Sequence, residues 1–292
     1  METIALNNGV KMPQLGFGVF QVTDWHVCEQ AVLQALEIGY RSLDTASSYQ
    51  NEEAVGAAIR KSGVARQDIF LTSKAYIQEM GYENTKAAFA RSCEKLGTAY
   101  LDLYLDLYLI HMPFADYYGA WRAMEELYKE GRIRAIGISN FLPDRLIDFC
   151  ENVSVMPTVN QLEIHPFYQR REELVLMADY GISAEGWAPF AEGVNGMFTN
   201  PVLTTIAKAH GKTVAQVILR WNIQRQIICI PKSVHRNRME KNRDIWDFTL
   251  SDEDMKRIAA LDLQRPQMFD PRKPSEVKRV YDYLNHPAVT SL

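Results

Sequence analysis

Short apolar runs alternate with longer amphipathic segments along most of the chain. The apolar runs, which we expect to form buried strands, cover residues 15–19, 40–43, 69–72, 105–110, 135–138, 159–162, 182–187 and 227–230. The segments between them have apolar residues at helical spacing and predict helices over residues 24–38, 52–61, 83–96, 118–130, 142–151, 171–180, 202–210 and 214–223. Strands that alternate with helices are typical of an α/β protein with a parallel sheet. Eight such units predict a closed (β/α)8 barrel, a TIM barrel, more than an open sheet.

The two ends of the chain depart from this alternation. Residues 4–12 predict a β-hairpin in which Asn8 and Gly9 supply the positive φ angles of a type I′ turn, and we expect it to plug one end of the barrel. Residues 263–292 contain four prolines and little periodicity, and we expect a loop and a short helix over the barrel mouth. Because no low-complexity linker divides the chain, we expect one domain over residues 1–292.

Composition and charge restrict the possible partners. The 292 residues are 47% hydrophobic and 23% charged, which suits one large α/β core. The net charge of -4 comes from 36 acidic and 32 basic residues without long blocks of either sign, so we expect neither nucleic acid nor an anionic membrane as a partner. The chain shows no signal-peptide pattern and no apolar run long enough to span a bilayer. We therefore expect a cytoplasmic monomer that acts on a small molecule.

The cysteines carry no sign of a metal site or a disulfide scaffold. Cys28, Cys93, Cys150 and Cys229 are scattered singly, without metal-ligand spacing. Reduced and mostly buried thiols are predicted.

Four ionisable residues stand at or just after the ends of consecutive predicted strands. Asp44 ends the second strand, Tyr49 follows in the next loop, Lys74 ends the third strand and His111 ends the fourth. The carboxyl ends of barrel strands meet at one face, so we expect the four to converge there. A buried cation lowers the pKa of a neighbouring tyrosine and makes it a usable acid near pH 7. Each residue alone has an ordinary structural explanation, but the set of four predicts a proton-donating site for carbonyl reduction.

Several motifs occur in an order that is specific to one enzyme family. They are residues 39–46 followed by Tyr49, Asn51 and Glu52, then residues 71–74, 109–113, 137–141 and 160–161, and finally residues 230–233 followed by Arg238 and Asn242. On these motifs the chain resembles the aldo-keto reductase family over nearly its whole length, and it is most similar to bacterial members of the 2,5-diketo-gluconate reductase and prostaglandin F synthase type. The resemblance implies an NADP-dependent oxidoreductase that reduces aldehydes and ketones to alcohols by hydride transfer.

The resemblance also implies a role for each of the four ionisable residues. Tyr49 would protonate the carbonyl oxygen as a general acid, and Lys74 would make its phenol more acidic. Asp44 would hold the Lys74 ammonium, and His111 would hydrogen-bond the substrate oxygen and set its angle. The substrate pocket would be lined by Phe20, Tyr49, Tyr76, His111 and Met112. The family often has tryptophan where Tyr76 and Met112 stand, a departure that affects the expected substrate and not the chemistry.

The sequence lacks a complete dinucleotide fingerprint. Gly16 and Gly18 begin a G-x-G-x-x-G pattern, but Gln21 occupies the third glycine position, so a Rossmann site is excluded. We interpret the two glycines as positions of close backbone approach or strand packing.

A different anion site is predicted after the last strand. Ser233 could cap free amides of the helix that follows, while Lys232 and Arg238 could clamp a phosphate, which favours NADPH over NADH. A solvated basic helix start explains these residues equally well when they are taken alone. The resemblance implies further cofactor contacts from Asp44, Ser139, Asn140, Gln161, Trp187 and Asn242, with Trp187 stacked on the nicotinamide. His165 is interpreted as structural.

A tandem repeat precedes His111. The tetrapeptide Leu-Asp-Leu-Tyr at residues 101–104 recurs at 105–108, and relatives carry it once. A shift of four residues preserves the two-residue alternation of a strand, so either copy could fill the strand. Because His111 must stay at the active face, we predict that residues 105–111 fill it and that the surplus, around residues 98–104, extends or bulges at the far end. Use of the first copy would displace His111 by roughly 13 Å.

Two other classes of protein stay open at this stage. A non-catalytic NADPH-binding regulatory protein on the same scaffold is disfavoured by the intact set of four residues and kept open by the repeat. A metal-dependent barrel hydrolase would need histidine and carboxylate ligands that converge at the mouth. The six histidines are isolated in sequence, so we predict no metal site.

Overall fold

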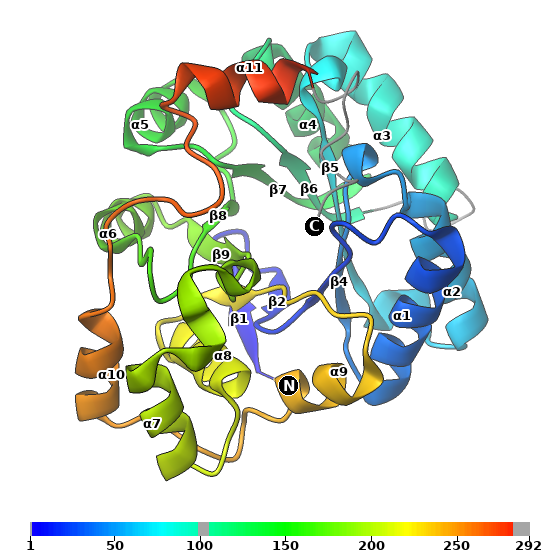
Figure 1. Ribbon diagram of the computed structural model, residues 1–292. Helices are drawn as coiled ribbons and strands as arrows, with labels where there is room; N and C mark the ends of the chain where they lie inside the picture. The colour runs from blue at the N-terminus through cyan, green and yellow to red at the C-terminus, as the bar shows by residue number, and fades with distance from the viewer. Residues whose placement is uncertain (1, 99–104, 283–292) are drawn as a thin grey trace.

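The computed structural model describes residues 2–98 and 105–282 and shows a parallel barrel surrounded by helices (Figure 1). The eight barrel strands are adjacent in chain order: β3 (Phe17–Gly18), β4 (Ser42–Asp44), β5 (Phe70–Ala75), β6 (Leu105–Ile110), β7 (Ile133–Ser139), β8 (Val159–Glu163), β9 (Ser183–Trp187) and β10 (Ile228–Cys229). A parallel bridge between Leu15 and Cys229 joins the last strand to the start of the first. The predicted (β/α)8 barrel is confirmed.

The helices pack around the outside of the barrel, and the predicted ones begin and end within one residue of the expected positions. They are α1 (Trp25–Ile38), α2 (Glu52–Ser62), α3 (Tyr82–Leu96), α4 (Tyr117–Lys129), α5 (Pro143–Asn152), α6 (Arg171–Asp179), α7 (Pro201–Ala209) and α8 (Val214–Gln224). Helix α1 begins where the Asp24 side chain accepts a hydrogen bond from the Val27 amide, and it ends at Gly39, whose φ is 104°. Local capping thus sets the ends that periodicity predicts.

Up to residue 282, where the described part of the chain ends, three further helices follow the last strand: α9 (Arg236–Arg243), α10 (Asp252–Ala259) and α11 (Pro274–Asp282). The helix expected after Ser233 is α9, and the short helix expected in the tail is α11. No sequence prediction was made for α10, although the Ser251 hydroxyl and the Asp254 carboxylate form a capping box at its start. Such a box is a sequence-level signal that could have located this helix.

An N-terminal hairpin closes the bottom of the barrel, as predicted. Strands β1 (Thr3–Ala5) and β2 (Lys11–Pro13) are antiparallel, and Leu6 and Met12 pack into a cluster with apolar side chains from the barrel strands. The predicted type I′ turn is wrong, because Gly9 has a positive φ of 83° and Asn8 does not. The Asn8 side chain instead accepts a hydrogen bond from the Val10 amide, so the loop needs one left-handed residue and not two.

Two glycines allow the first and last strands to approach each other closely. A Cβ added to Gly18 would lie 2.9 Å from the Ile230 carbonyl oxygen, and one added to Gly16 would lie 3.1 Å from the Ile230 Cγ2 atom. The Gly16 amide donates to the Cys229 carbonyl at 2.7 Å. The interpretation of these glycines as close-approach residues is confirmed.

The second copy of the repeated tetrapeptide occupies the fourth barrel strand. Strand β6 is Leu105–Ile110, paired with β5 through Leu107 and Thr72, and His111 follows at once. Asp106 fixes this register at the bottom of the barrel, since its carboxylate accepts from the Leu71 amide at 2.9 Å and pairs with Arg66 and Arg134. The prediction that residues 105–111 fill the strand is confirmed. The surplus predicted around residues 98–104 lies, apart from Thr98, outside the described residues.

All four cysteines are free and buried, as predicted. Within residues 2–98 and 105–282, no helix is both long enough and apolar enough to cross a membrane.

Candidate active site

The four predicted ionisable residues meet at the carboxyl-terminal face of the barrel. Asp44 is the last residue of β4, Lys74 lies near the end of β5 and His111 directly follows β6. Tyr49 ends the 3₁₀ turn η1 (Ser47–Tyr49) in the loop after β4. The parallel barrel therefore brings together side chains that are up to 67 residues apart in the sequence, from Asp44 to His111.

Lys74 is the centre of this group and is fully buried. Its ammonium nitrogen lies 2.6 Å from Asp44 Oδ1, 2.9 Å from the Thr45 carbonyl oxygen and 3.4 Å from the Tyr49 hydroxyl. Burial by itself lowers the pKa of an ammonium, but the Asp44 carboxylate and the Tyr49 hydroxyl outweigh it and raise the pKa of Lys74 above 10.5. Lys74 is thus a permanent buried cation that touches the tyrosine hydroxyl.

The loop that carries Tyr49 is held by buried hydrogen bonds. Asn51 accepts from the Thr45 hydroxyl at 2.7 Å and donates to the carbonyl oxygens of Val19 and Val22. Gln50 adopts a left-handed φ of 57°, which turns the chain from η1 into α2. These constraints fix the tyrosine on a short, rigid connection between β4 and α2.

The His111 imidazole stands beside the tyrosine. Its ring centroid lies 5.5 Å from that of Tyr49 and 5.4 Å from that of Tyr76, both edge to face, and its Nδ1 lies 3.4 Å from the Ser48 hydroxyl. The His111 side chain is partly exposed at the mouth. Burial of its ring in the surrounding protein lowers the pKa of the imidazole well below 6.5, and the positive charge of Lys74 lowers it further. The histidine is therefore neutral near pH 7.

A second buried carboxyl group lies behind the Asp44–Lys74 pair. The Gln161 amide nitrogen donates to Asp44 Oδ2 at 3.0 Å and to Glu185 Oε2 at 2.8 Å. Burial is the main cause that raises the pKa of Glu185 from 4.5 to about 8, and the nearby negative charge of Asp44 adds to it. Glu185 is fully buried and is accordingly protonated near neutral pH.

Glu185 was missed by the sequence reasoning. It lies in β9 two residues before Trp187, and residues two apart on a strand share a face. A glutamate within an otherwise apolar run was the signal that could have identified it.

Asn140 bonds to several of the other predicted site residues. It follows β7 with a left-handed φ of 63°, and its side-chain nitrogen donates to the His111 carbonyl oxygen at 3.1 Å and to the Ser139 hydroxyl at 3.0 Å. Its side-chain oxygen accepts from the Trp187 indole at 3.1 Å. The structure therefore places Ser139, Asn140 and Trp187 beside the four ionisable residues, and Gln161 bonds directly to one of them.

The residues predicted to line a substrate pocket surround the same place. The Phe20 ring lies 4.9 Å from the Tyr49 ring, and Met112 accepts a weak hydrogen bond from the Asn140 side chain through its sulfur at 3.3 Å. Tyr76 and Met112 also belong to an apolar cluster with Ile77, Phe114, Trp187 and residues of the tail. The tail thus forms part of the wall around the mouth, as predicted.

The predicted phosphate residues lie apart from this group, after β10. Lys232 and Arg238 are exposed, whereas Ser233 and Asn242 are buried. The Ser233 hydroxyl accepts from the His235 amide at 3.1 Å in the turn before α9, but no described side chain caps the first amides of α9, so the predicted capping of this helix by Ser233 is wrong. Two exposed cations beside this turn have the charge and freedom to reach a phosphate, and the half-buried Trp187 indole has a flat apolar surface. This set of donors fits a phosphorylated dinucleotide.

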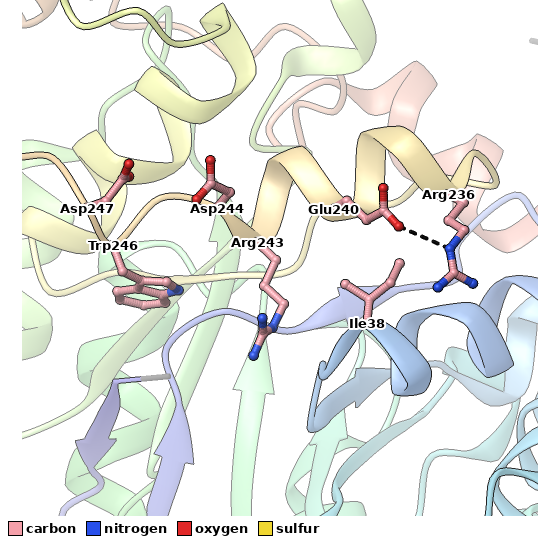
Figure 2. Close-up of a pocket in the computed structure, with 7 residues that line it drawn as sticks. All are labelled: Ile38, Arg236, Glu240, Arg243, Asp244, Trp246 and Asp247. Carbon is pink, nitrogen blue, oxygen red and sulfur yellow. Dashed lines mark hydrogen bonds and ion pairs between the residues drawn. The ribbon is translucent and has the colours of Figure 1, made fainter.

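An open hollow of about 600 Å³ lies on another side of α9 (Figure 2). Ile38 of α1 lines it together with Arg236, Glu240, Arg243, Asp244, Trp246 and Asp247. Arg236 bonds to Glu240 at 3.0 Å across its rim. Lys232 and Arg238 do not line this hollow, so it is separate from the predicted phosphate site.

Comparison with known proteins agrees with the geometry. The profile of the Aldo/keto reductase family matches residues 14–263. The chain is 48% identical over 261 residues to the glyoxal reductase of Bacillus subtilis (strain 168), covering 89% of this chain and 92% of that protein. It is 41% identical to the methylglyoxal reductase of Escherichia coli (strain K12), covering 89% and 93%.

Solved structures show the same relationship. A crystal structure of an aldo-keto reductase of Bombyx mori in complex with NADP superposes with a TM-score of 0.86 at 31% identity, covering 95% of this chain and 96% of that one. The crystal structure of an aldo/keto reductase from Brucella melitensis has a TM-score of 0.84 at 43% identity, covering 89% and 99%. The resemblance read from the motifs is confirmed, and the chain belongs to the aldo/keto reductase family.

Proposed function

We propose that this protein reduces aldehydes and ketones to alcohols with NADPH and that Tyr49 is its general acid. The observation that carries the proposal is the Tyr49 hydroxyl 3.4 Å from the buried Lys74 ammonium, which is itself 2.6 Å from Asp44. A cation at that distance stabilises the phenolate and so makes the phenol a stronger acid. The proton leaves the Tyr49 hydroxyl for the carbonyl oxygen as the carbonyl carbon is reduced.

His111 would orient the substrate. A neutral imidazole whose Nδ1 faces the Ser48 hydroxyl has Nε2 left for the carbonyl oxygen, and donation from Nε2 would fix the angle of that oxygen against the Tyr49 hydroxyl. Because the imidazole is neutral, it adds no second positive charge next to Lys74. This arrangement leaves Tyr49 as the proton donor and His111 as a hydrogen-bond donor.

The residues that would hold the cofactor form two groups. Ser139, Asn140, Gln161 and Trp187, close to Asp44, would bind the nicotinamide end, while Lys232, Ser233, Arg238 and Asn242 would bind the adenosine phosphate end. When bound, NADPH supplies the hydride. The relatives' names, glyoxal reductase and methylglyoxal reductase, make small dicarbonyl compounds the first substrates to test. The dispersed net charge of -4 supports the further proposal of a cytoplasmic monomer.

The test is a comparison of the wild type with Tyr49→Phe. We expect the wild type to oxidise NADPH in the presence of methylglyoxal or an aromatic aldehyde, and the variant to lose at least 100-fold in kcat while its affinity for NADPH stays within threefold. Loss of absorbance at the NADPH band reports turnover, and quenching of tryptophan fluorescence reports binding. Turnover by Tyr49→Phe at the wild-type rate would show that Tyr49 is not the general acid.

The same assay separates the alternatives. A non-catalytic NADPH-binding protein would bind the cofactor and turn over no aldehyde. A metal-dependent hydrolase would lose its activity in the presence of a chelator, whereas we expect carbonyl reduction to be unchanged by it.

A further inference from the structure

Glu163 is a fully buried carboxylate at the end of β8 that takes no part in the proposed chemistry. Three consecutive backbone amides of the tail donate to it: those of Gln267 at 2.6 Å and Met268 at 3.1 Å to Oε1, and that of Phe269 at 3.3 Å to Oε2. One strand end of the barrel is therefore bonded directly to a segment more than 100 residues later. In Figure 1 this segment runs from α10 past β8 toward α11.

His165 adds a fourth donor to the same carboxylate. Its Nε2 lies 3.0 Å from Glu163 Oε1, and both side chains are inaccessible to solvent. Because a carboxylate can only accept, the Nε2 of His165 must carry the proton. Both oxygens of Glu163 are thereby engaged, and each bond has a charged acceptor, which makes it stronger than a bond between neutral groups.

The tail that Glu163 holds continues into the wall of the substrate mouth. Phe269 packs in one apolar cluster with Tyr76, Phe114 and Val280 of α11, and Trp187 and Met112 lie against that cluster. The Tyr76 hydroxyl donates to the Val280 carbonyl oxygen at 3.3 Å, and the Tyr76 ring is in edge contact with His111. Glu163 is therefore connected to the active site through Phe269 and the apolar cluster that Phe269 shares with Tyr76.

We propose that Glu163 is a positioning residue for substrate selection, which fixes the tail in place and through it the size of the mouth. The bonds go to main-chain amides, so they hold the path of the tail whatever its side chains are. Substrates large enough to touch the tail wall depend on this anchor, while small dicarbonyls that bind between Tyr49 and His111 do not. The inference rests on the proposed carbonyl reduction and deepens it.

The test begins with Glu163→Gln, which keeps the size of the side chain. A glutamine has one acceptor oxygen, and its amide group faces N–H donors that it cannot bond. We expect amide hydrogen exchange of residues 267–269 to become about tenfold faster or more, since bonds to a charged acceptor are lost. Exchange in the barrel strands, for example at Ile136 and Leu162, should be unchanged, which shows that the variant is folded.

The kinetic readout compares two substrates in the same variant. For an aromatic aldehyde we expect KM to rise about tenfold or more, and for methylglyoxal we expect KM and kcat to stay within threefold of the wild type. A residue that only stabilises the fold would not separate the two substrates. Phe269→Ala provides a second route to the same result, because it removes the contact with the wall and leaves Glu163 intact, and it should show the same separation.

Glu276→Gln is the matched control. It also removes one carboxylate, from α11 itself, where Glu276 pairs with Arg279 on the surface. We expect wild-type exchange and wild-type kinetics from it. The proposal is overturned if Glu163→Gln leaves the exchange of residues 267–269 unchanged, or if it affects both substrates equally. If the wild type reduces neither aldehyde, the proposed function fails, and the exchange measurement alone still decides whether Glu163 anchors the tail.

Discussion

Replacing Glu185 by glutamine should change how the stability of the protein depends on pH. The glutamine keeps the size of the side chain and can still accept a hydrogen bond from Gln161, but it cannot ionise. The Asp44–Lys74 pair stays intact in this variant, so the comparison isolates one buried carboxyl group.

The magnitude follows from the pKa of Glu185, which burial and the Asp44 charge raise from 4.5 to about 8. Between these two values the folded protein keeps a proton that the unfolded chain has released. The free energy of unfolding therefore falls as the pH rises, by about 1.4 kcal/mol per pH unit from this one group. The stabilisation is fully present below pH 4.5 and is lost by about pH 8, a total of about 5 kcal/mol.

Urea unfolding at two pH values provides the assay. From pH 5.5 to 7.5 the wild type should lose about 3 kcal/mol more than Glu185→Gln does, because the other titrating groups are common to both proteins. Glu53→Gln, on the exposed side of α2, controls for the removal of a glutamate and should keep the wild-type dependence. Equal losses in the wild type and Glu185→Gln, within 0.5 kcal/mol, would show that Glu185 is not held protonated by its surroundings.

Three other predictions concern the buried ion pair, the repeat and the cofactor. Lys74→Met leaves the Asp44 carboxylate buried without its cation, so the free energy of unfolding should fall by about 3–5 kcal/mol in urea at pH 7, and a loss below 1 kcal/mol would speak against a strong pair. Deletion of residues 101–104 leaves one copy of the tetrapeptide, which fills β6, and halves the number of residues between α3 and β6. We expect kcat to be unchanged and the free energy of unfolding to rise by up to about 0.6 kcal/mol, because a shorter connection costs less entropy to close. Loss of activity would contradict the observed register. Replacing Lys232 and Arg238 by alanine should weaken NADPH about tenfold or more and NADH less than threefold in fluorescence titrations, and equal losses would remove their role at the phosphate.

Local sequence patterns were sufficient for most of the barrel. A strand such as β6 is buried along its length and mostly apolar because it is covered on both sides, and the helices have one apolar face, so periodicity locates both. The pattern failed at the end of β5, where Ser73 and Lys74 are polar and yet fully buried, Ser73 against Glu52 of α2 and Lys74 against Asp44. It failed also at the hairpin, where Asn8 and Gly9 occur in a loop that uses one left-handed residue and not two.

The motifs identified which side chains would gather at the carboxyl face, since a parallel barrel brings all strand ends together. The distances between these side chains are set by how β4, β5 and the loop after β6 pack against one another in the barrel. Gln161, on another strand, bridges Glu185 and Asp44 by hydrogen bonds, and no spacing along the chain reports such a contact.

By itself, the sequence determined the order of the barrel strands and of the helices between them, the barrel, the family and which four ionisable residues stand at the strand ends, because these depend on periodicity and on motifs local to each strand end. The tertiary structure decided which copy of the repeat fills β6, the protonation of Glu185 and the attachment of the tail to Glu163. Each of these depends on burial and on partners brought from distant parts of the chain. Such partners become neighbours only when the barrel closes.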